Sequence, residues 1–217
     1  MANVMGHFLE DQLALADALL ERRSQMFSPQ DLPGRYGRVV MAVDHLLEVV
    51  DCEAVLAGGW AVWHHGYIGR VTQDLDIVLA AESVDSLMRA ASVSGFEILA
   101  PKPGRWPKLL HKETNIQLDI LPEGARPGVA SKLAPTTIPH PAKMGGSGRI
   151  LNYISLPSLI ELKLAAGRAR DEADVVELIR VNPEHLDAIR LHLNSVHSHY
   201  LEHFNQLVER AREQGEE

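Results

Sequence analysis

The spacing of apolar residues in the first part of this chain predicts two helices and a strand. Apolar residues recur at helical intervals over residues 8–20, and the turn-forming sequence at 28–34 ends that segment. A second helix is predicted over residues 36–50, with its apolar side chains along one side. The apolar run at 54–57 then predicts a short strand, which leads into two adjacent glycines and a short helical segment.

The middle of the chain predicts further strands, because apolar residues there alternate with polar ones. The predicted elements are a strand over 74–79, a helix over 82–92, a strand over 96–99, a turn over 101–107 and a hairpin over 108–121. The hairpin turn is expected near Asn115. Residues 122–148 then carry five of the twelve prolines, and this composition is typical either of a lid or binding loop or of a surface excursion.

The C-terminal part predicts a strand over 150–154 and then helices. Ser155 and Pro157 precede a helix predicted over 159–169, and a further helix is expected to stop near Asn182. One final helix is predicted over 184–211, with an apolar stripe suited to packing on the body or on a second subunit, so the chain is expected to be a monomer or a homodimer through this helix. The stripe repeats every seven residues, at Leu186, Leu193, Tyr200 and Leu207.

These elements predict an α/β protein with a mixed, twisted sheet flanked by helices. We expect an N-terminal helical extension over residues 1–35, a core over 36–155 and a C-terminal helical region over 156–217. The formal net charge of -8 argues against a surface that coats nucleic acid. Cys52 is the single cysteine, and no stretch resembles a signal peptide or a membrane span. The expected location is therefore the cytoplasm, with no membrane partner.

Two carboxylates on one predicted strand point to a metal site. Asp74 and Asp76 are two residues apart, so both side chains lie on the same face. Like charges this close are costly unless a cation or a proton neutralises them, and carboxylate oxygens suit Mg²⁺ or Mn²⁺. Asp119 lies in the second arm of the predicted hairpin and can join the pair if the strands are neighbours. Gly58 and Gly59 would place a phosphate-binding turn beside this site.

The histidines of the predicted final helix also recur every seven residues, at His185, His192 and His199. His199 and His203 form an i, i+4 pair that could bind a transition metal, but these histidines flank the apolar stripe and a metal site is not favoured.

The order of these motifs resembles that of the DNA polymerase beta-type nucleotidyltransferase superfamily. The resemblance rests on Gly58-Gly59, on Arg70-x-Thr72-x-Asp74-x-Asp76 and on Asp119. The segments 161–166 and 168–174 look like two C-terminal motifs of AbiEii-type toxins and their uncharacterised nucleotidyltransferase-like relatives. The Gly-Gly-Trp sequence also looks like that of small antibiotic nucleotidyltransferases. One departure is Trp60, which stands where the superfamily more often has Ser or Thr and the toxin group has Thr.

The resemblance implies a metal-dependent transfer of a nucleoside monophosphate from a nucleoside triphosphate to an acceptor. Asp74, Asp76 and Asp119 would be the catalytic, metal-binding acids. Nucleotide-binding roles would fall to Gly58, Gly59, Arg70, Thr72 and Lys163, with support from Arg170, Asp171 and Asp174. The acceptor could be a small molecule, an RNA end or a protein. The alternative is a catalytically silent binding module of a toxin-antitoxin type system, with an antitoxin-like protein as its partner.

Overall fold

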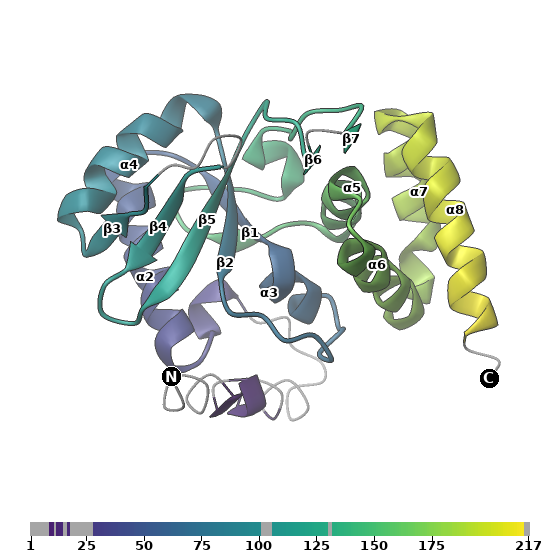
Figure 1. The fold of residues 1–217 in the computed structure, drawn as a ribbon, viewed down its shortest axis with the longest axis horizontal. Helices are drawn as coiled ribbons and strands as arrows, with labels where there is room; N and C mark the ends of the chain where they lie inside the picture. Colours follow the sequence, from purple (N-terminus) through teal and green to yellow (C-terminus); the bar gives the residue numbers. More distant parts are fainter. Residues whose placement is uncertain are drawn as a thin grey trace.

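The computed structural model describes residues 9, 10, 12–14, 17, 28–100, 106–129 and 132–214 (Figure 1). Most of the predicted helix over 8–20, much of the predicted N-terminal extension and most of the turn over 101–107 lie outside the described residues. Among the described residues, no helix has both the length and the apolar character needed to cross a bilayer.

A mixed sheet forms the centre of the described structure, with the strand order β3-β4-β5-β2-β1-β8. Strand β2 runs parallel to β5 and antiparallel to β1, whereas β4 is antiparallel to both β3 and β5. This arrangement confirms the predicted mixed sheet. The strand bounds are β1 Ala54–Ala57, β2 Leu75–Leu79, β3 Phe96–Ile98, β4 Lys108–His111, β5 Ile116–Pro122 and β8 Asn152–Tyr153.

Helices cover both faces of the sheet (Figure 1). Helices α2 and α4 pack on one face, and α5 and α6 face the other, with α7 and α8 outside them. Short 3-10 turns join several elements: η1 Pro29–Asp31, η2 Ala81–Ser83, η3 Pro141–Met144 and η4 Pro183–His185. The helix bounds are α2 Gly34–Val50, α3 Gly58–His64, α4 Val84–Val93, α5 Leu156–Ala166, α6 Ala169–Val181, α7 Leu186–Val196 and α8 Ser198–Glu213.

Side-chain alternation along β2 and β5 divides the core in two, as strand geometry requires. Leu75 and Ile77 join the apolar cluster under α2 and α4, together with Leu118 of the neighbouring strand. The residues between them, Asp76 and Asp119, are half-buried on the opposite face, toward α5 and α6. The acids therefore lie between the sheet and the C-terminal helices.

The predicted bounds of two C-terminal elements were wrong. Helix α5 starts at Leu156 rather than at residue 159, and it ends at Ala166 because Gly167 has a φ of 61°. Because residues 165–170 contain no proline, the sequence pattern predicted a helix that continues past its true end at Ala166. Strand β8 spans only Asn152–Tyr153, because the pairing with β1 involves just these two residues.

The predicted single helix over 184–211 was also wrong, because it is a turn followed by two packed helices. His197 separates α7 from α8 with an extended backbone, φ −166° and ψ 132°, and its Nδ1 accepts a hydrogen bond from the N–H of His199 at 3.2 Å. The break lets Leu193 and Tyr200 both face the core of the same chain. The apolar stripe is thus used for packing on the body.

The Pro-rich segment 122–148 packs against the core rather than lying entirely on the surface. It contains the two-stranded β6–β7 sheet, Gly128–Val129 and Lys132–Leu133, as well as η3. Ala134, Ile138 and Met144 are buried in the same apolar cluster as α5. The segment is anchored at these three residues, which argues against a surface excursion.

Candidate active site

Three acidic residues converge on one face of the sheet, at the neighbouring central strands β2 and β5. Asp76 in β2 lies directly opposite Asp119 in β5, since the two residues are partners in the parallel register. Asp74 stands two residues before Asp76, just ahead of β2, and it is also half-buried. The structure therefore brings together the three acids that the sequence pattern selected.

The environment of Asp76 disfavours its ionised form. Burial is the largest cause, and the neighbouring charges of Asp74 and Asp119 add to it, so the pKa of Asp76 rises to about 7. The positive charges of Lys163 and Arg70 oppose this rise without cancelling it. Among the described residues, Asp76 has no ion pair of its own. Its carboxylate is thus left for an external cation or a proton to neutralise.

Asp119 is held by two side chains of the same hairpin. Lys108 in β4 is its cross-strand partner, and the Lys108 Nζ lies 2.5 Å from Asp119 Oδ2. Gln117 Nε2 donates to Asp119 Oδ1 at 2.6 Å. Both carboxylate oxygens are therefore occupied by partners within the chain.

The donor set fits a hard divalent cation held by two carboxylates. No group of three acidic, histidine or cysteine side chains among the described residues forms a preassembled metal cage. Magnesium does not require one, because it usually binds one or two carboxylates and keeps water and substrate phosphates as its other ligands. Asp74 and Asp76 could provide such a pair, and Asp119 could join only by leaving Lys108 or Gln117.

Gly58 allows Asp76 to approach the backbone that follows β1. A Cβ atom at position 58 would lie 1.8 Å from Asp76 Oδ2, far inside the contact distance. The φ of Gly58 is +65°, which side-chain-bearing residues rarely adopt. A glycine is thus required here by Asp76 itself.

The Gly58→Ala variant is expected to lose at least about 2 kcal/mol of unfolding free energy, because the left-handed backbone and the clash with Asp76 both add cost. The matched control is Gly148→Ala, since Gly148 has a φ of +70° and a Cβ atom added there would have no heavy atom within 4 Å. That control should lose only about 1 kcal/mol in urea denaturation. Equal losses in the two variants would contradict the tight fit of Gly58 against Asp76.

Arg70 and Thr72 lie over the second glycine. A Cβ atom at Gly59 would lie 2.0 Å from Arg70 Nη1 and 2.4 Å from Thr72 Oγ1. The Thr72 hydroxyl is buried and has no hydrogen-bond partner within the described part of the chain. An orphaned hydroxyl next to a guanidinium is a suitable arrangement for binding an anion.

Trp60 points away from this cradle, although the sequence placed it where a phosphate-contacting hydroxyl is usual. Its ring is fully buried in the cluster under α2, 4.4 Å from the ring of Tyr36 and 6.0 Å from that of Trp63. Trp63 Nε1 donates to the carbonyl of Arg70, and Tyr36 donates to the carbonyl of Thr72 at 3.4 Å. The aromatic residues therefore fix the loop that carries Arg70 and Thr72.

A buried network of charges lies on the helical side of the acids. Lys163 Nζ is 2.6 Å from Asp174 Oδ2 and 3.7 Å from Asp171 Oδ1. Arg70 Nε lies 3.0 Å from the same Asp174 oxygen. Lys163, Asp171 and Asp174 are each at most 5% exposed, and the network joins α5, α6 and the loop before β2. Lys163 and Arg70 thereby face the site while their charge is shared with Asp174.

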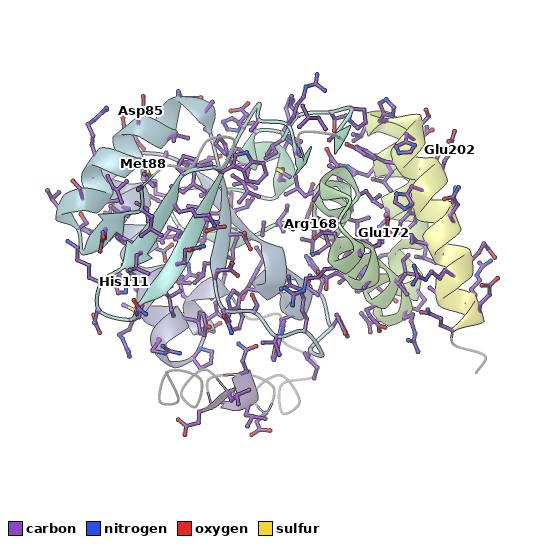
Figure 2. All side chains as sticks on the ribbon, in the orientation of Figure 1. Asp85, Met88, His111, Arg168, Glu172 and Glu202 are labelled. Atoms are coloured by element: carbon purple, nitrogen blue, oxygen red, sulfur yellow. The ribbon has the colours of Figure 1, made fainter. Side chains whose placement is uncertain are left out.

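Arg168, rather than Arg170, contacts this network. Arg168 Nε lies 2.6 Å from Asp171 Oδ2, and Nη2 donates to the other oxygen at 3.1 Å. Figure 2 shows Arg168 on the side of α6 toward the sheet, and its charge interacts with Asp76. Arg170 is exposed, and the structure gives it no ion pair among the described residues.

Sequence reasoning missed three residues of the site. Lys108 could have been found, because a hairpin turn near Asn115 places residue 108 opposite Asp119. Gln117 could also have been found, because side chains alternate along a strand and Gln117 is two residues from Asp119. No comparable signal distinguished Arg168 from Arg170, because the start of α6 was not predicted.

Comparisons with known proteins gave two kinds of result. No protein-family model matches the chain, and no curated protein does either. Among solved structures, a crystal structure of ANT(2'')-Ia in complex with adenylyl-2''-tobramycin is 15% identical, covering 82% of this chain and 97% of that one, with a TM-score of 0.41. A solution structure of the antibiotic-resistance factor ANT(2'')-Ia is 17% identical, covering 82% and 92%, with a TM-score of 0.40. At similarities this low, function has to be inferred from the site.

Proposed function

We propose that this protein is a nucleotidyltransferase, which moves a nucleoside monophosphate from a nucleoside triphosphate to an acceptor hydroxyl. The observation that carries the proposal is the Asp76 carboxylate, which is paired in register with Asp119 and has no cation partner in the described chain. The cations Arg70 and Lys163 face it from the opposite side. Carboxylates on one side and cations on the other suit a triphosphate bound together with a divalent metal.

In the proposed reaction, the acceptor oxygen forms a bond to the α phosphorus while the bond to the leaving pyrophosphate breaks. A divalent cation, Mg²⁺ or Mn²⁺, held by Asp74 and Asp76 would neutralise the phosphate charge during this step. Asp119 would accept the proton of the acceptor hydroxyl. Arg70 and Thr72 would donate hydrogen bonds to phosphate oxygens, since both lie against Gly59.

The test is transfer of label from each of the four α-labelled nucleoside triphosphates, with Mg²⁺ or Mn²⁺, into separate pools of small hydroxylated molecules, RNA and protein. We expect one pool to become labelled by the wild-type protein and not by Asp74→Ala. The control is Glu97→Gln, an exposed residue of β3 on the same sheet. If no pool became labelled with any of the four nucleotides, the transferase proposal would be refuted.

A second candidate function is a silent binding module, and the pairing of Asp119 with Lys108 and Gln117 favours it. Such a module would bind a partner, for example one of the antitoxin kind, without turnover. The similarity to AbiEii-type toxins stays a prediction, as do the protein partner and a homodimer. Thermal stabilisation by a nucleoside triphosphate with Mg²⁺, together with no labelled product, would support the module.

The Lys108→Met variant is expected to bind Mn²⁺ about 3- to 10-fold more tightly than the wild type. The reason is that the Lys108 ammonium competes with a metal for Asp119, at a distance of 2.5 Å. Lys108→Arg keeps the positive charge and should leave the affinity nearly unchanged. Titration of the free Mn²⁺ signal by electron paramagnetic resonance measures this without any turnover. An unchanged affinity in Lys108→Met would remove Asp119 from the metal site.

A further inference from the structure

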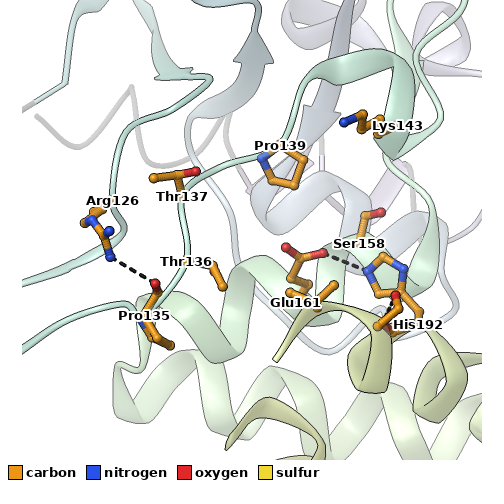
Figure 3. Close-up of a pocket in the computed structure, with 11 residues that line it drawn as sticks. Arg126, Pro135, Thr136, Thr137, Pro139, Lys143, Ser158, Glu161 and His192 are labelled. Carbon is orange, nitrogen blue, oxygen red and sulfur yellow. Dashed lines mark hydrogen bonds and ion pairs between the residues drawn. The ribbon is translucent and has the colours of Figure 1, made fainter. Parts of the chain in front are cut away.

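A cavity of about 640 Å³ is lined by α5, α7 and the segment 126–143 (Figure 3). Glu161 and Lys163 are two residues apart on this helix and therefore do not share a face. Lys163 contacts Asp174 of α6, whereas Glu161 contacts His192 of α7 and lines the cavity. The cavity is thus separate from the site proposed for nucleotidyl transfer.

The floor of the cavity is a buried pair of titratable residues. Glu161 is 2% exposed, and its Oε2 lies 2.7 Å from His192 Nε2. Figure 3 shows the second Glu161 oxygen directed away from His192, toward the space beside Thr136. Apart from Lys163, Glu161 is the one charged side chain of α5, whose other buried residues are mostly aliphatic. Leucine or isoleucine would fill this position at lower cost, so packing alone does not explain a carboxylate here.

Positive charges stand at two sides of the same cavity. Arg126 Nη1 donates to the carbonyls of Ala134 and Pro135, each at 3.0 Å, which fixes the guanidinium at the rim. Lys143, in η3, is exposed and has no ion pair within the described residues. Figure 3 shows Arg126 and Lys143 at opposite sides of the cavity, with Arg126 beside Pro135 and Lys143 beyond Pro139. An anionic group bound at the Lys143 side of the rim would therefore meet a charge-assisted donor that has no partner of its own among the described residues.

Hydroxyl groups line the wall of the cavity between its rim and its floor. Thr136 and Ser158 both line the cavity. Their orientations are fixed, because Thr136 Oγ1 lies 2.8 Å from the Tyr200 hydroxyl and Ser158 Oγ accepts from Ser155 Oγ at 2.9 Å. Together with the free Glu161 oxygen, these groups suit a ligand body that carries several hydroxyls rather than an apolar one.

We propose that this cavity is a second binding site, which takes a phosphorylated sugar or a similar hydroxylated monophosphate. The phosphate binds to Lys143 at one side of the rim, and a ligand hydroxyl donates to Glu161. The volume lies within the range of about 300–1,000 Å³ that is usual for small-molecule sites. This site goes beyond the transfer reaction and does not depend on it.

The experiment follows the imidazole signals of His192 in the full-length protein by ¹H–¹³C NMR, with the assignment taken from His192→Gln. The probe is ribose 5-phosphate, compared with ribose, inorganic phosphate and gluconate. We expect ribose 5-phosphate to shift the His192 signal with a dissociation constant at least about tenfold lower than that of any of the other three. No shift at about 20 mM ribose 5-phosphate would overturn the proposal, and equally tight binding of gluconate would overturn its phosphate specificity.

Two variants and a competitor complete the test. Lys143→Ala should weaken ribose 5-phosphate at least about fivefold, and Glu161→Gln, which keeps the side-chain shape, should weaken it as well. Lys112→Ala, an exposed lysine in the turn between β4 and β5, is the matched control and should change nothing. Saturation with Mg²⁺ and a non-hydrolysable nucleotide should leave the shift intact. Loss of the shift under that competition would instead place the probe in the transfer site.

Discussion

The Asp76→Asn variant is expected to abolish nucleotidyl transfer and, at the same time, to make the metal-free protein more stable at pH 8. Transfer should fall by about 1,000-fold or more, because one of the two proposed metal ligands is lost. The gain in stability follows from the position of Asp76, which is half-buried beside the carboxylates of Asp74 and Asp119. Asparagine has the same shape and carries no charge there.

The direction of the pH dependence follows from the raised pKa. Folding raises the pKa of Asp76 from 3.8 to about 7, so the folded protein holds a proton that the unfolded chain has already lost. The stability that this proton provides is fully present below about pH 4 and is lost as the pH rises to about 7. Relative to Asp76→Asn, the metal-free wild type should therefore weaken across this window by about 2–4 kcal/mol and change little above it.

Urea denaturation of both proteins between pH 4 and pH 8, with chelator present, measures this difference. The exposed Glu97→Gln variant is the control and should follow the wild type throughout. Addition of Mg²⁺ at pH 8 should raise the wild-type melting temperature and leave that of Asp76→Asn nearly unchanged. Parallel pH profiles for wild type and Asp76→Asn would mean that Asp76 carries no uncompensated charge in the fold.

The sequence was sufficient to place the acids but not their surroundings. Period-two alternation predicted the face of Asp76 and of Asp119, because both sit between residues that must be buried in the sheet. The alignment of the two acids depends on the pairing of β2 with β5. These two strands are separated in the sequence by α4, β3 and β4. Such long-range pairing has no local signal.

Contacts between distant side chains were the part that local patterns could not reveal. The local sequence around His192 gave no sign of its partner, Glu161, which is 31 residues away. Trp60 was judged by the family motif alone, whereas burial against Tyr36 decides where its ring points. The break at His197 has no glycine or proline that would predict it; the His197 side chain instead caps the start of α8.

The Asp174→Ala variant is expected to lose about 3–5 kcal/mol of unfolding free energy. Asp174 shares one oxygen between Lys163, at 2.6 Å, and Arg70, at 3.0 Å. Its removal leaves the Lys163 ammonium buried, with only Asp171 at 3.7 Å for compensation. Urea denaturation followed by tryptophan fluorescence measures the loss.

The control lies on the same helix. Glu177 of α6 makes an exposed ion pair with Arg180 at 3.4 Å, so Glu177→Ala should cost less than about 1 kcal/mol. A similar loss in the two variants would show that the buried network contributes no more than a surface pair.

A double variant separates the structural role of this network from its role in transfer. In Lys163→Met with Asp174→Leu, no lysine ammonium remains buried without a partner, so part of the stability lost in Asp174→Ala should return. Transfer activity should not return, because the Lys163 charge that faces Asp76, and that would face a bound triphosphate, is absent. If activity recovered along with stability, Lys163 would be a structural partner of Asp174, and Arg70 would be left as the cation that faces the phosphates.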